Sequence, residues 1–251
     1  MKVECVIPAK NEEKYLPDTL KSIMEQDMEI DRVVVVDDGS TDRTSEIALG
    51  MGAEVLSVSS QHVGRVVGPH VASLINKGLG TIRRDLPQYV LICGADDILQ
   101  ENYVSYLVEK MRENPLLVIA SGSSTTDKAY RSIPRGVRVV FGAWWRDNKF
   151  RYEERPGWEE LLCLSAVHTG CRATRFSQVR FRQARAAFTY KAPIDLGRSM
   201  KATGYPMYRA MLRAGKMYRA RPDQMVRALI SYVFETVPPK WVKNARRRYG
   251  W

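Results

Sequence analysis

The sequence contains few of the residues that build metal centres or cross-linked scaffolds. Its 251 residues include four cysteines and three histidines. No two cysteines form a C-x-x-C pair and the histidines lack a metal-binding spacing, which argues against zinc fingers and iron–sulfur clusters. So few cysteines also argue against a disulfide framework. We therefore expect a protein of a reducing compartment, located in the cytoplasm.

Long apolar runs are missing as well. Residues 1–8 have a charge inside their apolar run and are too short for the core of a signal peptide. No window approaches about 18 uninterrupted apolar residues, so we expect no transmembrane helix. The composition, 45% hydrophobic and 27% charged, excludes disordered, collagen-like and coiled-coil chains. It favours one large α/β domain or two small globular domains.

Charge is distributed unevenly along the chain, whose formal net charge is +11. Residues 1–125 carry 12 Lys and Arg against 19 Asp and Glu, whereas residues 126–251 carry 27 against 9. An acidic half joined to a very basic half suggests two tasks, one of which meets a polyanion or an anionic surface.

The first half alternates between strand and helix patterns. Short apolar runs predict strands at residues 3–7, 33–36, 53–58, 89–93 and 116–120. Helical spacing of apolar residues between them predicts helices at residues 17–26, 71–77 and 104–111, and Ser40 or Thr41 is expected to cap a further helix. Repeated β-α-β units predict a doubly wound, mostly parallel sheet with helices on both faces. Ligands of such sheets bind beyond the carboxyl ends of the strands.

The second half is less regular. Its patterns predict strands at residues 137–145 and 172–181 and helices at residues 159–168, 207–214 and 224–236. We divide the chain into an α/β domain at residues 1–190 and a basic, partly helical extension at residues 191–251. Within the domain we distinguish residues 1–120, which carry the regular pattern, from residues 121–190.

Acidic clusters follow two of the predicted strands. Asp96 and Asp97 come after one buried strand, and their paired oxygens suit a hard cation such as Mg²⁺ or Mn²⁺. The alternative is an Asx turn with a helix cap. Asp37 and Asp38 follow another strand, where an acid could accept hydrogen bonds from a base or ribose; the alternative is a strand-to-helix turn in which Gly39 has a positive φ.

Three sequence blocks carry a family resemblance. The runs VIPAKNEEKYLPDTLKSIMEQ, VVVVDDGSTDRT and YVLICGADDIL resemble the inverting family 2 glycosyltransferases of GT-A fold, in the same order and spacing over about the first 120 residues. The resemblance implies a nucleotide-diphospho-sugar donor. By this resemblance Asp38 meets the nucleotide base, with Pro8, Ala9 and Glu12 nearby. Asp96 is then the principal ligand of a divalent metal on the diphosphate, helped by Asp97.

One position departs from the family pattern. Family members usually have D-A-D-D after this strand, and here Gly94 stands where the first Asp belongs. That acid commonly contacts the ribose or water around the metal. The departure leaves open a weaker metal site, or a divergent protein that binds the sugar nucleotide without catalysis.

The run RPGWEELLCLSAVHTGC offers a looser match to the family's E-D-x-x-L helix, which ends about a dozen residues later in a glycine. Counting back from Gly170 places Glu159 at the position of the family's Asp, which resembles a general base for the acceptor hydroxyl. A shift of one residue assigns that role to Glu160. The alternative is an acid in the first turn of a helix, where Glu is favoured by the helix dipole.

Several arginines are candidates to neutralise the diphosphate. Arg182 and Arg185 follow the last predicted strand, where the family often has an H-x-R-like segment, and Arg65 lies in a glycine-containing loop after the third strand. In a half this rich in basic residues, some arginines occur at such positions by chance.

The C-terminal segment could contact a membrane surface. Residues 225–237 are apolar on more than one side and are followed by a basic, aromatic tail, a combination that suits peripheral contact with anionic lipid. The alternative is a packed helix with a solvated tail.

These patterns favour a glycosyltransferase that moves a sugar to a glycan or to polyprenyl phosphate by a metal-assisted inverting displacement. A basic nucleic-acid-binding protein is a second class, favoured by the pI of 9.6. No nucleic-acid-binding motif accompanies that charge, and the acidic half carries the better-organised motifs, so we do not expect nucleic acid as a partner.

Overall fold

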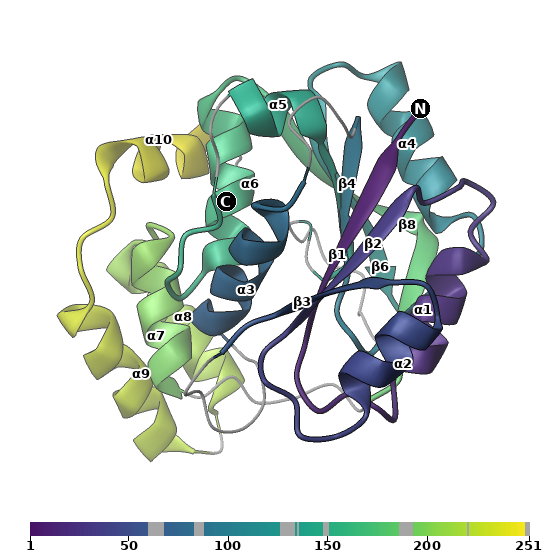
Figure 1. Cartoon of the computed structure of the whole chain (residues 1–251). Coiled ribbons are helices and arrows are strands. Elements are labelled where there is room, and N and C mark those ends of the chain that lie inside the picture. Colours follow the sequence, from purple (N-terminus) through teal and green to yellow (C-terminus); the bar gives the residue numbers. More distant parts are fainter. Residues whose placement is uncertain are drawn as a thin grey trace.

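The structure is a computed structural model that describes residues 1–59, 68–82, 88–125, 134, 136–147, 151–185, 193–219 and 221–248. Its described strands form one sheet in the order β3-β2-β1-β4-β7-β6-β8-β5 (Figure 1). The strands are β1 Val3–Ala9, β2 Arg32–Asp37, β3 Glu54–Ser57, β4 Tyr89–Ile92, β5 Asp97–Leu99, β6 Leu117–Ser124, β7 Arg138–Phe141 and β8 Arg172–Gln183.

The sheet is mostly parallel, as the sequence predicts. Strands β1, β2, β3 and β4 run parallel to one another, and β6 runs parallel to β8. Strand β7 lies antiparallel between β4 and β6, and β5 lies antiparallel to β8 at the edge. The chain order reverses at β1, which has β2 on one side and β4 on the other. That reversal is a topological switch point, where doubly wound sheets bind their ligands.

Helices cover both faces of the sheet (Figure 1). Strand β2 shows why: Val33 and Val35 enter one apolar core and Val34 and Val36 the other, because successive side chains point to opposite faces. The first core includes residues of α1, α2 and α4, and the second includes residues of α3, α5 and α6. These helices are α1 Leu16–Met24, α2 Thr44–Gly50, α3 Pro69–Leu79, α4 Tyr103–Glu113, α5 Gly142–Asp147 and α6 Trp158–His168.

Two local predictions are wrong. Helix α2 begins at Thr44, so neither Ser40 nor Thr41 caps it. The Ser40 hydroxyl instead donates to Asp37, because a turn places it beside that carboxylate. The strand predicted at residues 137–145 ends at Phe141, and residues 142–147 form α5. The aromatic residues at the end of that segment suit a strand by composition, but they pack as a helix.

The C-terminal extension contains α7 Pro193–Ala202, α8 Met207–Met217, α9 Pro222–Phe234 and α10 Lys240–Arg248. The sequence predicted α8 and α9 but neither α7 nor α10. Helices α7, α8 and α9 share a small apolar core, and α7 and α9 pack so closely that a Cβ on Gly197 would lie 1.9 Å from the Ala228 carbonyl oxygen. Helix α10 packs on α6, where Val242 meets Leu161 and Leu164. Within the described part of the chain, no helix has the length and apolar character needed to cross a membrane.

Candidate active site

The loops after β1 and β2 are joined into one cradle at the switch point. Asn11, the one described non-glycine residue with a positive φ (52°), turns the first loop toward the second. Its backbone N–H donates to the Ser40 hydroxyl at 2.9 Å, and its side-chain oxygen accepts from the Thr41 N–H at 2.8 Å. The Glu12 N–H donates to the Thr44 hydroxyl at 2.8 Å. These bonds hold the PAKNE and DDGST segments as one surface beyond the strand ends.

Asp37 and Asp38 have different roles. Asp37 is a turn residue, because its carboxylate accepts from the Ser40 N–H at 3.0 Å and from the Ser45 hydroxyl at 2.6 Å. Gly39 has a φ of 71°, as the turn interpretation predicted. Only the second acid of the pair is therefore left to meet a ligand.

Asp38 lies buried between two basic side chains. The Lys10 ammonium donates to the Asp38 carbonyl at 2.7 Å and lies 3.4 Å from its Oδ2, and His70 Nε2 lies 2.9 Å from the same oxygen. The sequence reasoning did not single out Lys10 or His70. Lys10 stands inside the PAKNE run, but no local signal marked His70, which reaches Asp38 only through the packing of α3 on the sheet. Any ligand group that bonds to the Asp38 carboxylate competes with Lys10 and His70 for it.

Arg185 gathers the donor-side candidates. Its guanidinium makes an ion pair with Glu12, lies with Nε 3.7 Å from Asp96 Oδ2, and covers the Tyr15 ring at 4.6 Å. The neighbouring Ala184 N–H donates to the Asp96 carbonyl at 2.7 Å, which ties the end of β8 to the end of β4. These contacts hold the Arg185 guanidinium in one place between Glu12 and Asp96.

Asp97 is turned away from this surface. It is buried, and its Oδ2 accepts from the Gly94 N–H at 2.9 Å. Burial and the neighbouring charge of Asp96 raise the pKa of the Asp97 carboxyl to about 7, although the Gly94 bond acts in the opposite direction. A Cβ at position 94 would lie 2.7 Å from that oxygen. A side chain at position 94 would collide with the Asp97 carboxylate, so the glycine at this position allows Asp97 to point inward.

A divalent metal fits this surface only through Asp96. In the described ranges, no three or more His, Cys, Asp and Glu residues gather where they could hold a metal ion. The Asp96 side chain is 21% exposed and faces the strand ends, whereas Asp97 is buried against Gly94. Mg²⁺ in proteins is often held by one or two carboxylates with substrate phosphates and water completing its shell. The residues present fit a metal that enters with the diphosphate.

Glu159 lies at the start of α6. Its Oε1 accepts from the Gly136 N–H at 3.0 Å and from Arg138 Nη2 at 2.5 Å, and its side chain remains 27% exposed. Arg138 is buried and packs against the Trp158 ring at 5.1 Å. Trp158 thus packs against the arginine that donates to Glu159. The negative charge of Glu159 also contributes, as the last of several causes, to the raised pKa of Asp97.

Two other candidates, Glu160 and Arg182, do not join this group. Glu160 is buried and forms an ion pair with Arg246 of α10, so an acceptor cannot reach its carboxylate. Because consecutive helix residues point about 100° apart, Glu160 faces the extension when Glu159 faces the sheet. Arg182 is exposed and lines a separate groove with α1 residues such as Asp18. Its side chain alternates away from that of Phe181 along β8. Arg65 lies outside the described residues.

One protein family matches most of the chain. The model of the family described as "Glycosyl transferase family 2" matches residues 4–179. That span runs from β1 into β8 and includes Asp38, Asp96 and Glu159. It ends before Arg185 and before the C-terminal extension.

Curated relatives match shorter stretches. The 4,4'-diaponeurosporenoate glycosyltransferase of Staphylococcus haemolyticus is 48% identical over 62 residues, 25% of this chain and 16% of that protein. Glycosyltransferase GlyG of Streptococcus pneumoniae is 27% identical over 127 residues, 51% of this chain and 40% of that protein. The chain thus covers less than half the length of these relatives.

Solved structures share the fold over more of the chain. TarS 1–349 of S. aureus has a TM-score of 0.62 at 14% identity and covers 99% of this chain and 92% of its own. Glucosyl-3-phosphoglycerate synthase of Mycobacterium tuberculosis, in a complex with Mg²⁺ and uridine diphosphate, has a TM-score of 0.58 at 18% identity, covering 80% and 76%. At these identities the likeness shows the fold alone.

Proposed function

The chain belongs to glycosyl transferase family 2, and we propose that it moves a sugar from a nucleotide-diphospho-sugar to an acceptor. The observation that carries this proposal is the convergence of Glu12, Asp96 and Arg185 at the switch point of the sheet, next to the cradle that holds Asp38. A sugar nucleotide requires a hydrogen-bond acceptor for its nucleotide base, which Asp38 would supply, and a cation for its diphosphate, which Arg185 would supply.

In this proposal the donor lies across the carboxyl ends of β2, β1 and β4. Its base bonds to Asp38, with Pro8 and Ala9 at the end of β1 forming the adjacent wall. Its diphosphate meets Arg185, whose ion pair with Glu12 fixes the guanidinium in place. A Mg²⁺ or Mn²⁺ ion at Asp96 would polarise the diphosphate oxygens and offset the charge of the leaving group.

Glu159 is proposed as the base on the acceptor side. It takes the proton from the acceptor hydroxyl as that oxygen attacks the anomeric carbon from the face opposite the diphosphate, which inverts the configuration in one displacement. Arg138 and the Gly136 N–H hold the carboxylate in its orientation. A phosphate acceptor, which is already an anion, needs less help from such a base than a neutral hydroxyl does.

The acceptor is proposed to be a glycan or a polyprenyl phosphate. The Lys and Arg side chains of the second half suit an anionic acceptor, and they also suit a peripheral position at an anionic membrane surface.

A sugar-nucleotide-binding protein without catalysis is the second candidate function. The observation that favours it is Asp97, which occupies the space beside Gly94 and leaves Asp96 as the one outward carboxylate of the cluster.

Thermal unfolding with a panel of nucleotide-sugars, with and without Mn²⁺, tests the proposal. A donor present at about 100 times its dissociation constant should stabilise the folded state by about 2.7 kcal/mol. We expect stabilisation by at least one sugar nucleotide, strengthened by Mn²⁺. The absence of any stabilisation across the panel would contradict donor binding. Stabilisation without release of sugar to water or to any acceptor would favour the non-catalytic alternative.

A further inference from the structure

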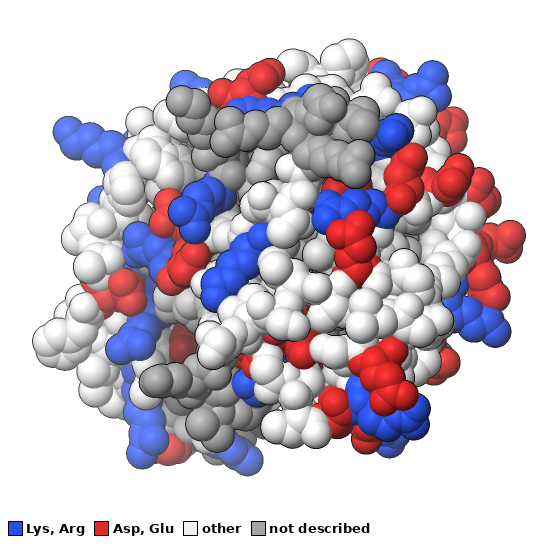
Figure 2. All heavy atoms as spheres, viewed as in Figure 1, with Lys and Arg blue, Asp and Glu red and all other residues white. Residues whose placement is uncertain are grey.

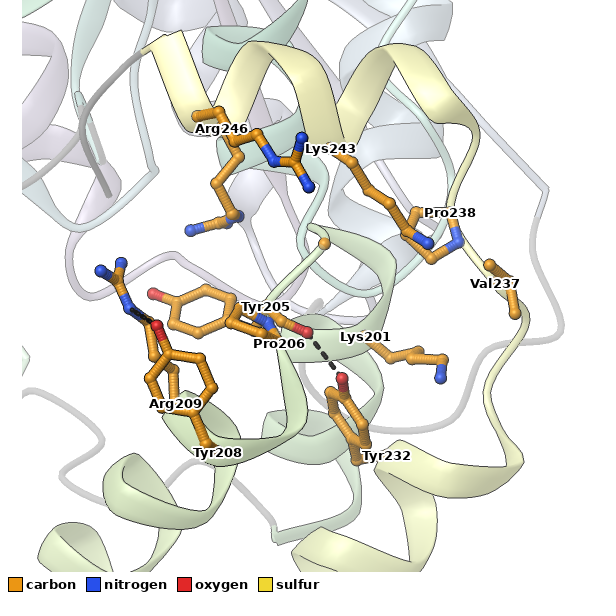
Figure 3. A pocket seen from close by; sticks show the side chains of 12 residues that line it. Lys201, Tyr205, Pro206, Tyr208, Arg209, Tyr232, Val237, Pro238, Lys243 and Arg246 are labelled. Atoms are coloured by element: carbon orange, nitrogen blue, oxygen red, sulfur yellow. Dashed lines mark hydrogen bonds between the residues drawn. The ribbon is translucent and has the colours of Figure 1, made fainter.

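A pocket of about 480 Å³ lies among the C-terminal helices, away from the candidate active site (Figure 3). Lys201 comes to it from α7, Arg209 from α8, Tyr232 from α9, and Lys243 and Arg247 from α10. In Figure 3 Lys243 extends from α10 toward Pro238, whereas the Arg246 guanidinium lies over the Tyr205 ring. The volume suits a small ligand or a head group.

The pocket is lined by positive charge. Its cationic residues are Lys201, Arg209, Lys243, Arg246 and Arg247, and no Asp or Glu is among its described lining residues. Arg246 already pairs with Glu160 beneath the pocket. Within the described part of the chain, no carboxylate pairs with Lys201, Lys243 or Arg247. An anion in the pocket would therefore gain charge-assisted hydrogen bonds that the protein itself does not supply.

Tyrosine rings hold two of these cations in place. The Arg246 guanidinium covers the Tyr205 ring at 4.0 Å, and the Lys201 ammonium lies 4.8 Å from the centre of the Tyr232 ring. The Tyr232 hydroxyl donates to the Tyr205 carbonyl at 2.6 Å, which joins α9 to the start of α8. The pocket is thus built from several elements that are bonded to one another, rather than from solvated side chains on one helix.

Exposed apolar side chains are concentrated in the extension that contains the pocket. Tyr208 and Val237 both line the pocket and are exposed, by 60% and 67%. Of the exposed large apolar side chains that the structure describes, all but four lie in the C-terminal extension. Those on α8 and α9 are Met207, Tyr208, Met211, Leu212, Met217, Val226, Ile230, Val233 and Phe234. At the left edge of Figure 2, where Figure 1 draws the segment between α9 and α10, uncharged atoms protrude beside Lys and Arg side chains. A single-residue exposure is ordinary, but a concentration of this kind marks an interaction surface.

We propose that the C-terminal helices dock on an anionic membrane, with the phosphate of a lipid head group in this pocket and the exposed apolar side chains of α8 and α9 in the interfacial region. The cations of the pocket select the charge of the head group, and the apolar surroundings select a lipid over a free phosphate or a nucleic acid, neither of which would cover those side chains. This site deepens the membrane contact proposed above, but it requires no sugar transfer.

Flotation of the full chain with vesicles tests the proposal. We expect binding to vesicles of phosphatidylcholine mixed with phosphatidylglycerol, and much weaker binding to phosphatidylcholine alone. Lys243→Gln/Arg247→Gln removes two pocket charges, and Lys240→Gln/Arg248→Gln removes two from the same helix outside the pocket lining. All four side chains are exposed, so both variants should fold, and their melting temperatures verify it.

The two variants separate a built site from general attraction. The pocket variant should lose affinity for anionic vesicles by about tenfold or more, because its two cations contact the lipid phosphate directly. The control should lose less than about threefold, because its two cations lie outside the pocket and contact no head group there. An equal loss in both variants, or equal binding of the unaltered chain to both kinds of vesicle, would overturn the pocket assignment.

A third variant and a soluble probe identify the source of the phosphate. Phe234→Gln should weaken vesicle binding severalfold, whereas Leu49→Gln, at an exposed apolar residue of the α/β domain, should not. Thermal stabilisation by glycerol phosphate without any vesicle binding would overturn the lipid proposal in favour of a soluble ligand. The pocket variants are also tested with the panel of nucleotide-sugars, and their thermal stabilisation by a sugar nucleotide should be unchanged. Loss of vesicle binding alone would therefore concern the lipid site and not the proposed sugar transfer.

Discussion

The α/β domain and the C-terminal helices use their apolar residues in opposite ways. The domain buries its apolar side chains on both faces of the sheet, in two large cores. The extension has one small core of its own and leaves most of the protein's exposed large apolar side chains on its surface. It also holds 14 Lys and Arg against 3 Asp and Glu at residues 191–251. Among the described residues, the domain therefore buries most of its large apolar side chains, whereas the extension exposes many of its own.

The two regions are nevertheless joined at the helix that carries Glu159. Helix α10 packs on α6, and Arg246 forms a buried ion pair with Glu160 and donates to the Thr203 carbonyl. A Cβ on Gly157, which precedes α6, would lie 2.7 Å from a Thr203 methyl group. The extension thus helps to position the start of α6, although it contributes no side chain to the candidate active site.

The largest effect is expected where the domain carries the chemistry. Glu159→Gln should lower transfer to a neutral hydroxyl acceptor by roughly 10²–10⁴-fold, mainly in kcat, because the amide can bond to the hydroxyl but cannot take its proton. Donor binding and vesicle binding should be unchanged. Steady-state kinetics with a polyprenyl phosphate alongside a neutral sugar should show a smaller loss for the phosphate. Full activity with both acceptors would remove Glu159 from the mechanism.

The link between the regions should be the next most sensitive point. Arg246→Met should reduce the free energy of unfolding by about 3–5 kcal/mol, because it leaves the Glu160 carboxylate buried without its partner. Arg246→Met/Glu160→Gln should recover part of that loss. Urea denaturation measures both. Lys110→Met is the control: it breaks the pair with the half-exposed Glu113 and should cost less than about 1 kcal/mol.

Close packing at the acidic turn distinguishes this domain from its family pattern. Gly94→Ala should destabilise the fold by about 1–3 kcal/mol, because the new Cβ displaces Asp97 from the Gly94 N–H. In Gly94→Ala/Asp97→Ala the two losses should not add, since both remove the same bond. Additive losses in chemical denaturation would show that the two residues are not coupled.

Buried Asp97 should make the stability of the domain depend on pH in the acidic to neutral range. Its pKa is raised to about 7, whereas in the unfolded chain an Asp titrates near ~3.9. Between those values the folded state binds more protons, so stability falls as pH rises, by at most ~1.4 kcal/mol per pH unit. The Asp97→Asn variant should not show this fall. The difference in the free energy of unfolding between the unaltered protein and the variant should therefore change with pH. Parallel stability profiles from pH 4 to 7, obtained by urea denaturation, would contradict the assignment.

The smallest effect should come from the exposed apolar surface of the extension. Phe234→Ala should change the free energy of unfolding by less than about 0.5 kcal/mol, because the side chain is 84% exposed. Leu91→Ala, in the first core of the domain, should cost about 2–5 kcal/mol. A large loss at Phe234 would mean that this residue supports the fold rather than an external contact.

The sequence alone was sufficient for the parts of the fold that depend on local pattern. The apolar run of β2 and the helical spacing of Leu16, Leu20 and Ile23 predict their elements, because burial on a sheet or one helix face repeats every few residues. Asp38 follows the carboxyl end of β2, and Asp96 follows that of β4. Because parallel strands end at the same edge of a sheet, the topology alone predicts that these two acids lie at one edge.

Only the tertiary structure decided which of the candidate side chains meet. Arg185 reaches Glu12 across 173 residues of chain and Arg246 reaches Glu160 across 86, and no periodicity records such pairings. The inward turn of Asp97 and the contact of His70 with Asp38 depend in the same way on how neighbouring segments pack. Local sequence sets which conformation a segment prefers. The partner of a charged side chain is set by the burial that the whole fold imposes, because a charge removed from water must find its counterpart wherever the chain places one.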